Sequence, residues 1–212
     1  MSRPVPIDLP TADAVVRESD ARMAPLVEVE AVFTPEECRR IIARREVLGF
    51  DDAPIPTAAA GAKARAHQVD RSVRDTLRTH LLPTPEHAWI FDRLGAVVAT
   101  TNDHTWRFRI AFMEPLQHLS YPEGGHFLWH SDLGDRGIAS LRKVSATILL
   151  SAPGDYDGGD LQLLVAGKEI TPGRGQGKAV LFPSFMNHRV TAVTRGVRHV
   201  LILWTIGRHA LR

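Results

Sequence analysis

The chain has 212 residues, of which 44% are hydrophobic and 24% are charged, and its formal net charge is +2. This composition is that of a globular protein, and the length fits one compact domain. The small net charge gives no reason to expect nucleic-acid binding, and the lack of 18 or more consecutive apolar residues argues against a transmembrane helix.

Residues 1 to 24 form a polar segment that contains proline and lacks an apolar run of signal-peptide length. We expect this segment to be poorly ordered and residues 25 to 212 to form a single domain. Cys38 is the only cysteine, so no intramolecular disulfide can form and a reducing compartment is favoured. The sequence therefore predicts a cytoplasmic protein.

The first predicted elements are a strand over residues 26 to 33, where apolar residues alternate, and a helix that begins after Thr34. Threonine can cap a helix, Pro35 suits its first position, and Glu37 stands where a capping box needs a carboxylate. We expect this helix to continue to about Leu48. Its buried side would carry Cys38, Ile41, Ile42 and Leu48.

Residues 51 to 69 lack a convincing hydrophobic period and predict a long loop, which makes them a candidate lid. A short strand is expected around Ser72. A second helix should begin near Thr84-Pro85-Glu86 and continue to about Thr100. Its inward side would carry Trp89, Ile90, Leu94, Val97 and Val98, and the two helices would brace one sheet.

The densest group of basic residues lies between these two helices and is interspersed with Asp70 and Asp75. Its members are Lys63, Arg65, Arg71, Arg74 and Arg78. A basic group of this kind can bind nucleic acid or form a solvated face. The interspersed acids favour the solvated face, and the pI near 9.0 does not change that interpretation.

Beyond His104 the pattern becomes that of short strands separated by turn-rich connections such as residues 153 to 159 and 172 to 178. The expected strands cover residues 106–112, 116–121, 127–132, 144–150, 161–165, 179–182, 188–193 and 197–206. Eight short segments fit a jelly roll, so the predicted fold is mainly β with supporting N-terminal helices.

His130 and Asp132 are separated by one residue within a predicted strand, so both side chains can point to the same face and chelate one ion. A third ligand must come from another strand, and His188 lies in one. Two imidazoles and one carboxylate leave three open positions on an octahedral ion, which suits non-haem Fe(II). Zinc more often has a closed or single-vacancy tetrahedral site.

Three segments of the chain resemble the Fe(II)/2-oxoglutarate-dependent dioxygenases of the prolyl-4-hydroxylase-like type. They are YPEGGHFLWHSD at 121–132, KVSATILLSAPGDYDGGDL at 143–161 and AVLFPSFMNHRVTAVTRGVRHVLILW at 179–204. The resemblance spans roughly residues 105 to 207 and implies a double-stranded β-helix, a cupin-like jelly roll. It implies that His130, Asp132 and His188 bind iron and that Arg198 pairs with the distal carboxylate of 2-oxoglutarate. It also implies that the Tyr121 phenol donates a hydrogen bond to 2-oxoglutarate. It also implies O2 as a substrate and ascorbate as a candidate reductant.

A physical argument supports Arg198 separately, because a dicarboxylate buried in a barrel needs a fixed counter-charge and a guanidinium offers a bidentate fork. Arg198 shares strand parity with Val200, Ile202 and Trp204, so it begins an otherwise apolar face. The alternative is a strand-end arginine that reaches solvent. Arg195 is the competing candidate, but it lies in a Thr-Arg-Gly turn and should be solvated.

Several other residues near the predicted site have an ordinary structural interpretation. His126 could line the pocket, although packing or a hydrogen bond is favoured. Trp129 should point away from the metal, and Trp204 should belong to the core. Arg107 and Arg109 share a strand face, so substrate contact by one of them is an alternative to solvation.

The function implied by this resemblance is hydroxylation of a C–H bond, with 2-oxoglutarate converted to succinate and CO2. We expect an amino-acid-like substrate, either a residue in a protein or a free small molecule, and neither nucleic acid nor membrane as a partner. The retained Asp132 disfavours a halogenase, and tryptophan at position 204 departs from the second arginine of the DNA-dealkylating branch. Oxidative demethylation or another biosynthetic oxidation, and a non-catalytic cupin-like metal-binding module, remain as alternatives.

Overall fold

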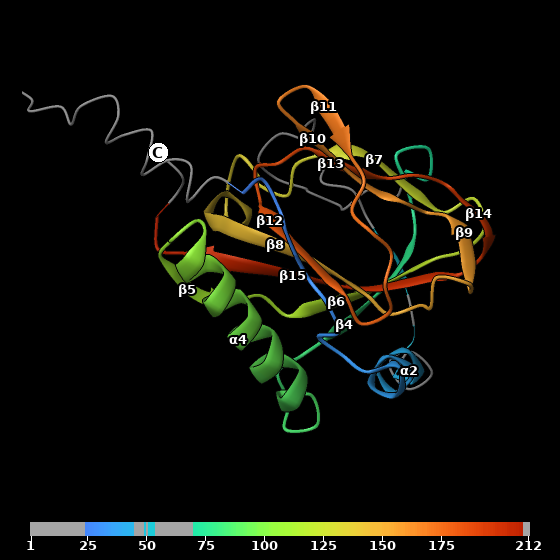
Figure 1. Cartoon of the computed structure of the whole chain (residues 1–212), viewed down its shortest axis with the longest axis horizontal. Coiled ribbons are helices and arrows are strands. Elements are labelled where there is room, and N and C mark those ends of the chain that lie inside the picture. Colours follow the sequence, from blue (N-terminus) through green and yellow to red (C-terminus); the bar gives the residue numbers. More distant parts are fainter. Residues whose placement is uncertain (1–23, 45–48, 50, 54–69, 210–212) are drawn as a thin grey trace, which may run out of the picture.

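The computed structural model describes residues 24–44, 49, 51–53 and 70–209, which form two antiparallel sheets facing each other as a jelly roll (Figure 1). The larger sheet, here called the major sheet, has the strand order β1-β12-β8-β15-β6-β4-β2, and β5 pairs with β15. Its strands are β1 (Val27–Val29), β12 (Ala179–Pro183), β8 (Arg142–Leu149), β15 (Arg198–Gly207), β6 (Leu116–Tyr121), β4 (Leu77–Leu81), β2 (Asp51–Asp52) and β5 (Ile110–Met113).

The smaller sheet, here called the minor sheet, has the order β11-β10-β13-β7-β3. Its strands are β11 (Lys168–Ile170), β10 (Leu161–Val165), β13 (His188–Val190), β7 (His126–His130) and β3 (Arg74–Asp75). A separate pair, β14 (Val193–Gly196) and β9 (Tyr156–Gly158), lies at one end of the two sheets, as Figure 1 shows. Sequence-distant strands therefore lie side by side, which places ligands from different segments near one another.

The predicted jelly roll is confirmed, and the strands at 116–121 and 161–165 have the predicted bounds. Four strands were not predicted: β2, β4, β9 and β11. The strand expected at 106–112 begins only at Ile110, because Arg107 adopts a positive φ of 54° in the turn that follows the second helix. The stretch expected at 188–193 is divided into β13 and the first residue of β14, which pair with different partners.

Helix α2 (Pro35–Ala43) has the predicted capping box: the Thr34 side chain accepts from the Glu37 backbone, and the Glu37 carboxylate accepts from the Thr34 N–H. These contacts satisfy two amides that the helix itself leaves without partners. The helix ends at Ala43 rather than near Leu48, and residues 45–48 lie outside the described residues.

Helix α4 (Ala88–His104) begins three residues later than Pro85, the first helical position that the Thr84-Pro85-Glu86 signal predicts. Residues 85–87 form a turn instead, in which the His87 ring contacts the Leu82 carbonyl and the Thr84 hydroxyl. Ile90, Leu94 and Val98 are buried as expected. The helix therefore keeps the predicted apolar side but has a different start.

Both helices pack on the same face of the major sheet, below it in Figure 1. The main hydrophobic core joins Cys38 and Ile41 of α2, Ile90 and Leu94 of α4, and the sheet residue Leu203. The expectation that two helices brace one sheet is confirmed. This packing covers the outer face of the major sheet and leaves its inner face to form the pocket described below.

Two predictions fall mainly on residues that the structure does not describe. The N-terminal segment at 1–24 overlaps the described chain only at its last residue, and of the candidate lid at 51–69 only residues 51–53 are described. No helix of the described chain is both long and apolar enough to cross a membrane.

Candidate active site

A pocket between the two sheets gathers the five residues that the sequence predicted to form the site. His130 is the last residue of β7, and Asp132 follows two residues beyond the end of that strand, which was predicted to include it. His188 comes from the start of β13, Arg198 from the start of β15 and Tyr121 from the end of β6. The metal-ligand candidates thus lie on the minor sheet, and the two predicted cosubstrate residues lie on the major sheet.

The three candidate ligands lie close enough to bind one ion, since their ligand atoms are all within 4.8 Å of one another. His130 Nε2 is 3.8 Å from Asp132 Oδ1, and His188 Nε2 is 3.5 Å from Asp132 Oδ2. His130 and His188 are directly opposite each other in the antiparallel β7–β13 pair. Strand pairing, and not a local turn, therefore brings the third ligand to the other two.

A register shift in the β7–β13 pair changes which side chains of β7 face the pocket. His188 pairs with His130, whereas Val190 pairs with Phe127, so β7 has one residue more than its partner in this interval. Phe127 therefore faces inward with His130, and their rings stack with centroids 3.5 Å apart. Simple alternation along the strand does not predict this inward phenylalanine.

Hydrogen bonds to the backbone fix the orientation of both candidate histidines. His130 Nδ1 lies 2.7 Å from the Leu128 carbonyl oxygen, and His188 Nδ1 lies 3.0 Å from the Met186 carbonyl oxygen. A carbonyl can only accept, so each Nδ1 carries the proton and each Nε2 presents a lone pair to the pocket. This is the arrangement that metal-binding histidines use, and it fits a divalent ion.

The charge states of the triad also suit a cation. Burial lowers the pKa of His130 to about 3, and the neighbouring His188 adds to this effect, so the imidazole is neutral at ordinary pH. Burial by itself raises the pKa of Asp132, but His188 and His130 outweigh it, so the net pKa is lowered. The site therefore presents a neutral His130 imidazole beside the Asp132 carboxylate.

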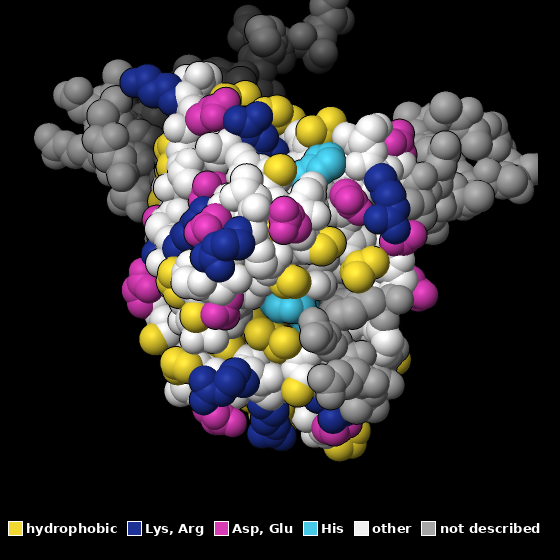
Figure 2. Space-filling model, turned by 90° about the vertical axis from the view of Figure 1, so that its right-hand side faces the viewer, with side chains coloured by type: hydrophobic (Ala, Val, Ile, Leu, Met, Phe, Trp, Pro, Cys, Tyr) yellow, Lys and Arg dark blue, Asp and Glu magenta, His cyan; other side chains and the backbone are white. Residues whose placement is uncertain are grey.

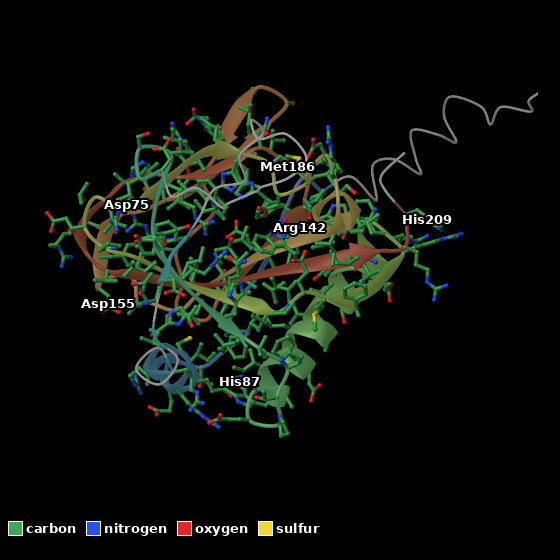
Figure 3. All side chains as sticks on the ribbon, turned by 180° about the vertical axis from the view of Figure 1, so that it is seen from behind. Asp75, His87, Arg142, Asp155, Met186 and His209 are labelled. Carbon is green, nitrogen blue, oxygen red and sulfur yellow. The ribbon has the colours of Figure 1, made fainter. Side chains whose placement is uncertain are left out.

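Residues of the major sheet contact Asp132. One of them is Arg142, which is labelled in Figure 3. The polar groups of Ser145 and Trp204 lower the pKa of Asp132, although Trp204 Nε1 itself lies outside hydrogen-bonding geometry. Arg142 stacks on the Trp204 ring at 3.6 Å, donates to the Asp132 carbonyl at 3.2 Å and forms a bidentate pair with Glu114. Trp204 thus lines the pocket as well as belonging to the sheet.

Arg198 is a buried charged side chain whose surroundings indicate that it binds a ligand. It is 1% exposed, and none of its three guanidinium nitrogens has a hydrogen-bond partner among the described residues. Its Cζ lies 5.2 Å from the ring centroid of Tyr121, the residue opposite it in the β6–β15 pair. A buried guanidinium without an anion is costly, so this end of the pocket is built for an anionic ligand.

Tyr121 is buried beside Arg198, with 2% of its surface exposed. Burial raises the pKa of the phenol, and the nearby guanidinium groups of Arg74 and Arg198 offset only part of this effect. The phenol therefore keeps its proton at ordinary pH and can donate a hydrogen bond. Tyr121 and Arg198 together offer donors of the kind that a carboxylate accepts.

Residues that the sequence left outside the site are indeed directed elsewhere. The two ring nitrogens of His126 contact the Gly124 and Ser72 carbonyls, and Trp129 lies under Arg189 at 4.7 Å on the outer face. Arg195 is exposed and pairs with Asp157 at 2.6 Å. Neither Arg107 nor Arg109 lines this pocket. Substrate contact by one of them stays a prediction.

Arg74 is the pocket residue that the sequence interpretation missed. The basic group at 63–78 was expected to be a solvated face, but Arg74 is only 7% exposed and lines the pocket. Its Cζ lies 4.6 Å from the ring centroid of Phe127, with which it pairs across β3 and β7. Burial lowers the pKa of this guanidinium. No sequence signal separates it from Arg71, which is exposed and pairs with Asp52 and Asp75.

Comparison with known proteins identifies the protein family that has this arrangement of residues. Residues 116–206 match the family model described as the 2OG-Fe(II) oxygenase superfamily. A PKHD-type hydroxylase of Nitrobacter winogradskyi is 30% identical over 190 residues, which cover 84% of this chain and 76% of that protein. Another, from Pseudomonas fluorescens (strain Pf0-1), is 29% identical over 192 residues, with 85% and 77% covered.

The chain belongs to the 2OG-Fe(II) oxygenase superfamily. It is a prolyl-4-hydroxylase-like, 2-oxoglutarate-dependent Fe(II) dioxygenase that uses Fe(II), 2-oxoglutarate and O2.

Solved structures show the same oxygenase fold. A Pseudomonas putida prolyl-4-hydroxylase superposes with a TM-score of 0.69 at 19% identity, covering 92% of this chain and 98% of that one. A Trichoplax adhaerens prolyl hydroxylase, in complex with a peptide fragment of the hypoxia inducible factor oxygen degradation domain, gives a TM-score of 0.71 at 14% identity, covering 93% and 94%. At these identities the likeness concerns the fold of the oxygenase and not its substrate.

Figure 2 shows the face of this oxygenase that lies on the right-hand side of Figure 1. Acidic and basic side chains are interspersed there, and hydrophobic side chains lie between them. Arg195 and Asp157 form one such exposed pair in β14 and β9, and Arg174 and Asp160 form a half-buried pair near them. This face is therefore mixed in charge and is not uniformly charged.

Proposed function

We propose that this oxygenase hydroxylates a C–H bond of an amino-acid-like substrate with iron bound by His130, Asp132 and His188. Arg198 and Tyr121 would bind the distal carboxylate of 2-oxoglutarate. The products would be the hydroxylated substrate, succinate and CO2, so that one atom of O2 enters the substrate and the other enters succinate.

The observation that supports this proposal most strongly is the pairing of a buried, unpartnered guanidinium with a metal-binding triad in one pocket. A metal-binding module without turnover would need the triad but would have no use for Arg198. A keto diacid needs both, because one end chelates the ion and the other end carries a second carboxylate.

Each residue then has a definite task. The Leu128 and Met186 carbonyls keep His130 and His188 in the tautomer that presents Nε2, and Arg142 holds the Asp132 backbone by donating to its carbonyl. The apolar pocket wall, which includes Leu119 and Ile202, excludes water from the reacting groups. Ferrous iron supplies the redox chemistry by which O2 and 2-oxoglutarate oxidise the substrate.

The amino-acid-like substrate is supported by likeness to proteins that are named prolyl hydroxylases, one of them solved with a peptide fragment. A protein residue and a free small molecule both belong to this class. We also propose a cytoplasmic location, in keeping with the single buried Cys38, and a single catalytic domain over residues 25–212.

The first experiment is anaerobic addition of Fe(II) and 2-oxoglutarate to the metal-free protein. We expect a weak metal-to-ligand absorption band in the visible range, and succinate under air with a suitable substrate. Mass spectrometry of peptide and metabolite mixtures would then detect a 2-oxoglutarate-dependent gain of one oxygen. A protein that binds iron without forming the band would contradict the proposed cosubstrate site.

The Arg198→Gln variant tests the cosubstrate role within the same titration. Removing a charged hydrogen-bond donor should weaken 2-oxoglutarate binding by about ten- to a hundredfold while iron is still bound. Arg195→Gln is the matched control, because Arg195 is exposed and three residues away. Equal cosubstrate affinity in the two variants would remove Arg198 from the proposed site. Asp132→Ala should lose both the iron and the band.

A further inference from the structure

We propose that Gly159 is a specificity-determining residue, because the lack of a side chain there sets the position of the Arg198 guanidinium and so the length of the 2-oxo acid that the pocket accepts. This inference rests on the proposed function, since it assumes that Arg198 binds the distal carboxylate of 2-oxoglutarate. It identifies a backbone position, and not a further charged group, as the feature that selects a five-carbon diacid.

The first observation is the close approach of Gly159 to the Arg198 side chain. A Cβ added at this glycine would lie 2.9 Å from Arg198 Cδ and 2.9 Å from Val193 Cγ2. Carbon atoms in contact are normally about 3.5–4.0 Å apart, so any other residue at position 159 must displace its neighbours. The glycine therefore leaves the space that the stem of Arg198 occupies.

The second observation is that hydrogen bonds fix the turn that carries Gly159. The Gly159 N–H donates to the Ala192 carbonyl at 3.0 Å. Arg174 donates to the Gly158 carbonyl at 2.7 Å, and its Nε and Nη2 donate to Asp160 Oδ1 at 2.9 and 2.7 Å. The residues on both sides of the glycine are thus held in place, so the turn resists moving away from Arg198.

The third observation is that the backbone of Arg198 is fixed while its guanidinium is not. Arg198 pairs with Tyr121 of β6, and Val200 of the same strand pairs with Leu149 of β8. None of the three guanidinium nitrogens has a hydrogen-bond partner among the described residues. When position 159 gains a Cβ, the Arg198 side chain is therefore the part that can move, and its guanidinium moves with it.

The position of this guanidinium determines which chain length fits between it and the metal-ligand triad. A 2-oxo diacid has to reach from the ion, which its 2-oxo acid end chelates, to Arg198, which its distal carboxylate pairs with. A bidentate pair tolerates little displacement, because hydrogen bonds weaken steeply as they lengthen and bend. Moving the guanidinium therefore removes the advantage of the five-carbon chain over a shorter one.

The test compares three 2-oxo acids in anaerobic titrations of the Fe(II) protein, followed by the visible absorption band. Oxaloacetate is one methylene shorter than 2-oxoglutarate, and 2-oxobutyrate lacks the distal carboxylate. For Gly159→Ala we expect the affinity for 2-oxoglutarate to fall by about tenfold or more, the cost of a misplaced charged hydrogen bond. Oxaloacetate should lose less affinity than 2-oxoglutarate. 2-Oxobutyrate, which does not reach Arg198, should bind as in the wild type.

Gly167→Ala is the matched control, because Gly167 also has a positive φ and a Cβ added there would meet no atom within 4 Å among the described residues. It introduces left-handed backbone strain alone and should leave all three affinities unchanged. If Gly159→Ala does not fold, the double variant Gly159→Ala/Val193→Ala is compared with Val193→Ala. The double variant loses one of the two short contacts and keeps the one with Arg198 Cδ, so the same loss of 2-oxoglutarate affinity is expected.

Three results for Gly159→Ala would overturn the inference. Unchanged affinity for 2-oxoglutarate would show that Gly159 does not position Arg198. Equal losses for 2-oxoglutarate and oxaloacetate would show that it does not select chain length, and an equal loss for 2-oxobutyrate would place the damage at the iron end of the pocket. A wild type that prefers 2-oxoglutarate to 2-oxobutyrate keeps the proposed function standing in each case. A wild type without that preference would instead count against the proposed role of Arg198.

Discussion

The two sheets of the barrel differ in what covers their outer faces. They also contribute different residues to the site. The central strands of the major sheet, β12, β8, β15 and β6, are buried along almost their whole length, with helices outside and the pocket inside. The minor sheet has one open face, where Trp129 and Leu164 are exposed. Arg198 and Tyr121 come from the covered sheet, and the metal-ligand candidates come from the open one.

This comparison indicates that the covered sheet gives the fold its stability while the open sheet carries groups that must meet metal and substrate. A buried charge such as Arg198 needs rigid surroundings, because small movements would let water reach it. The edge strand β3, which carries Arg74, consists of only two residues. Substitutions matched across the two sheets can test this difference.

The largest expected effect on stability comes from paired core and surface substitutions. Leu203→Ala removes a side chain that is 0% exposed in the main core and should lower the free energy of unfolding by about 2–5 kcal/mol. Leu164→Ala, at a side chain that is 38% exposed on the minor sheet, should change it by no more than about 0.5 kcal/mol. Urea denaturation would measure both. Similar losses would mean that the minor sheet contributes equally to stability.

Alanine substitutions at two glycines with the same backbone conformation should have an intermediate effect on the free energy of unfolding. Gly177 and Gly167 both have φ of +78°. A Cβ added at Gly177 would lie 1.8 Å from the Phe33 carbonyl oxygen, whereas a Cβ added at Gly167 would have no neighbouring atom within 4 Å among the described residues. Gly167→Ala should cost about 1–2 kcal/mol for the left-handed conformation alone. Gly177→Ala should cost more, because the turn before β12 must also move. Thermal unfolding of both variants gives the order, and a reversed order would contradict this account.

The smallest expected effect concerns the cap of α2 and depends on pH. The hydrogen bond from Arg93, together with the Thr34 N–H, lowers the pKa of Glu37 from 4.5 to about 2. A lowered folded-state pKa adds stability that is fully present above pH 4.5 and is lost as pH falls toward 2. The stability advantage of the wild type over Glu37→Gln should therefore shrink across this interval.

Glu36→Gln, at an exposed neighbour in the same turn, serves as the control for Glu37. Its effect on the free energy of unfolding should be small at every pH, because exposed ion pairs contribute little. Urea denaturation at several pH values between 7 and 2.5 would measure both variants. A pH-independent difference for Glu37→Gln would show that its hydrogen bonds do not depend on the carboxylate charge.

The sequence predicted those parts of the fold that local chemistry controls. The Thr34 to Glu37 capping box fixes a helix start because all its partners lie within four residues. The start of α4 was predicted too early, because the Thr84 hydroxyl contacts the His87 ring in a turn and does not cap the helix. Strand β4 was missed because only two of its five residues, Leu77 and Leu81, are apolar, although they share a face with Thr79.

For the site, the sequence by itself determined the H-x-D spacing, the second histidine and the arginine that begins an apolar strand, since residue type and strand parity carry that information. Only the tertiary structure decided that Phe127 turns inward, because a register shift in β7 breaks the parity, and that Arg74 is buried while Arg71 is solvated. These outcomes depend on which strand lies next to which. That neighbour relation joins residues far apart in the chain, so no local pattern can encode it.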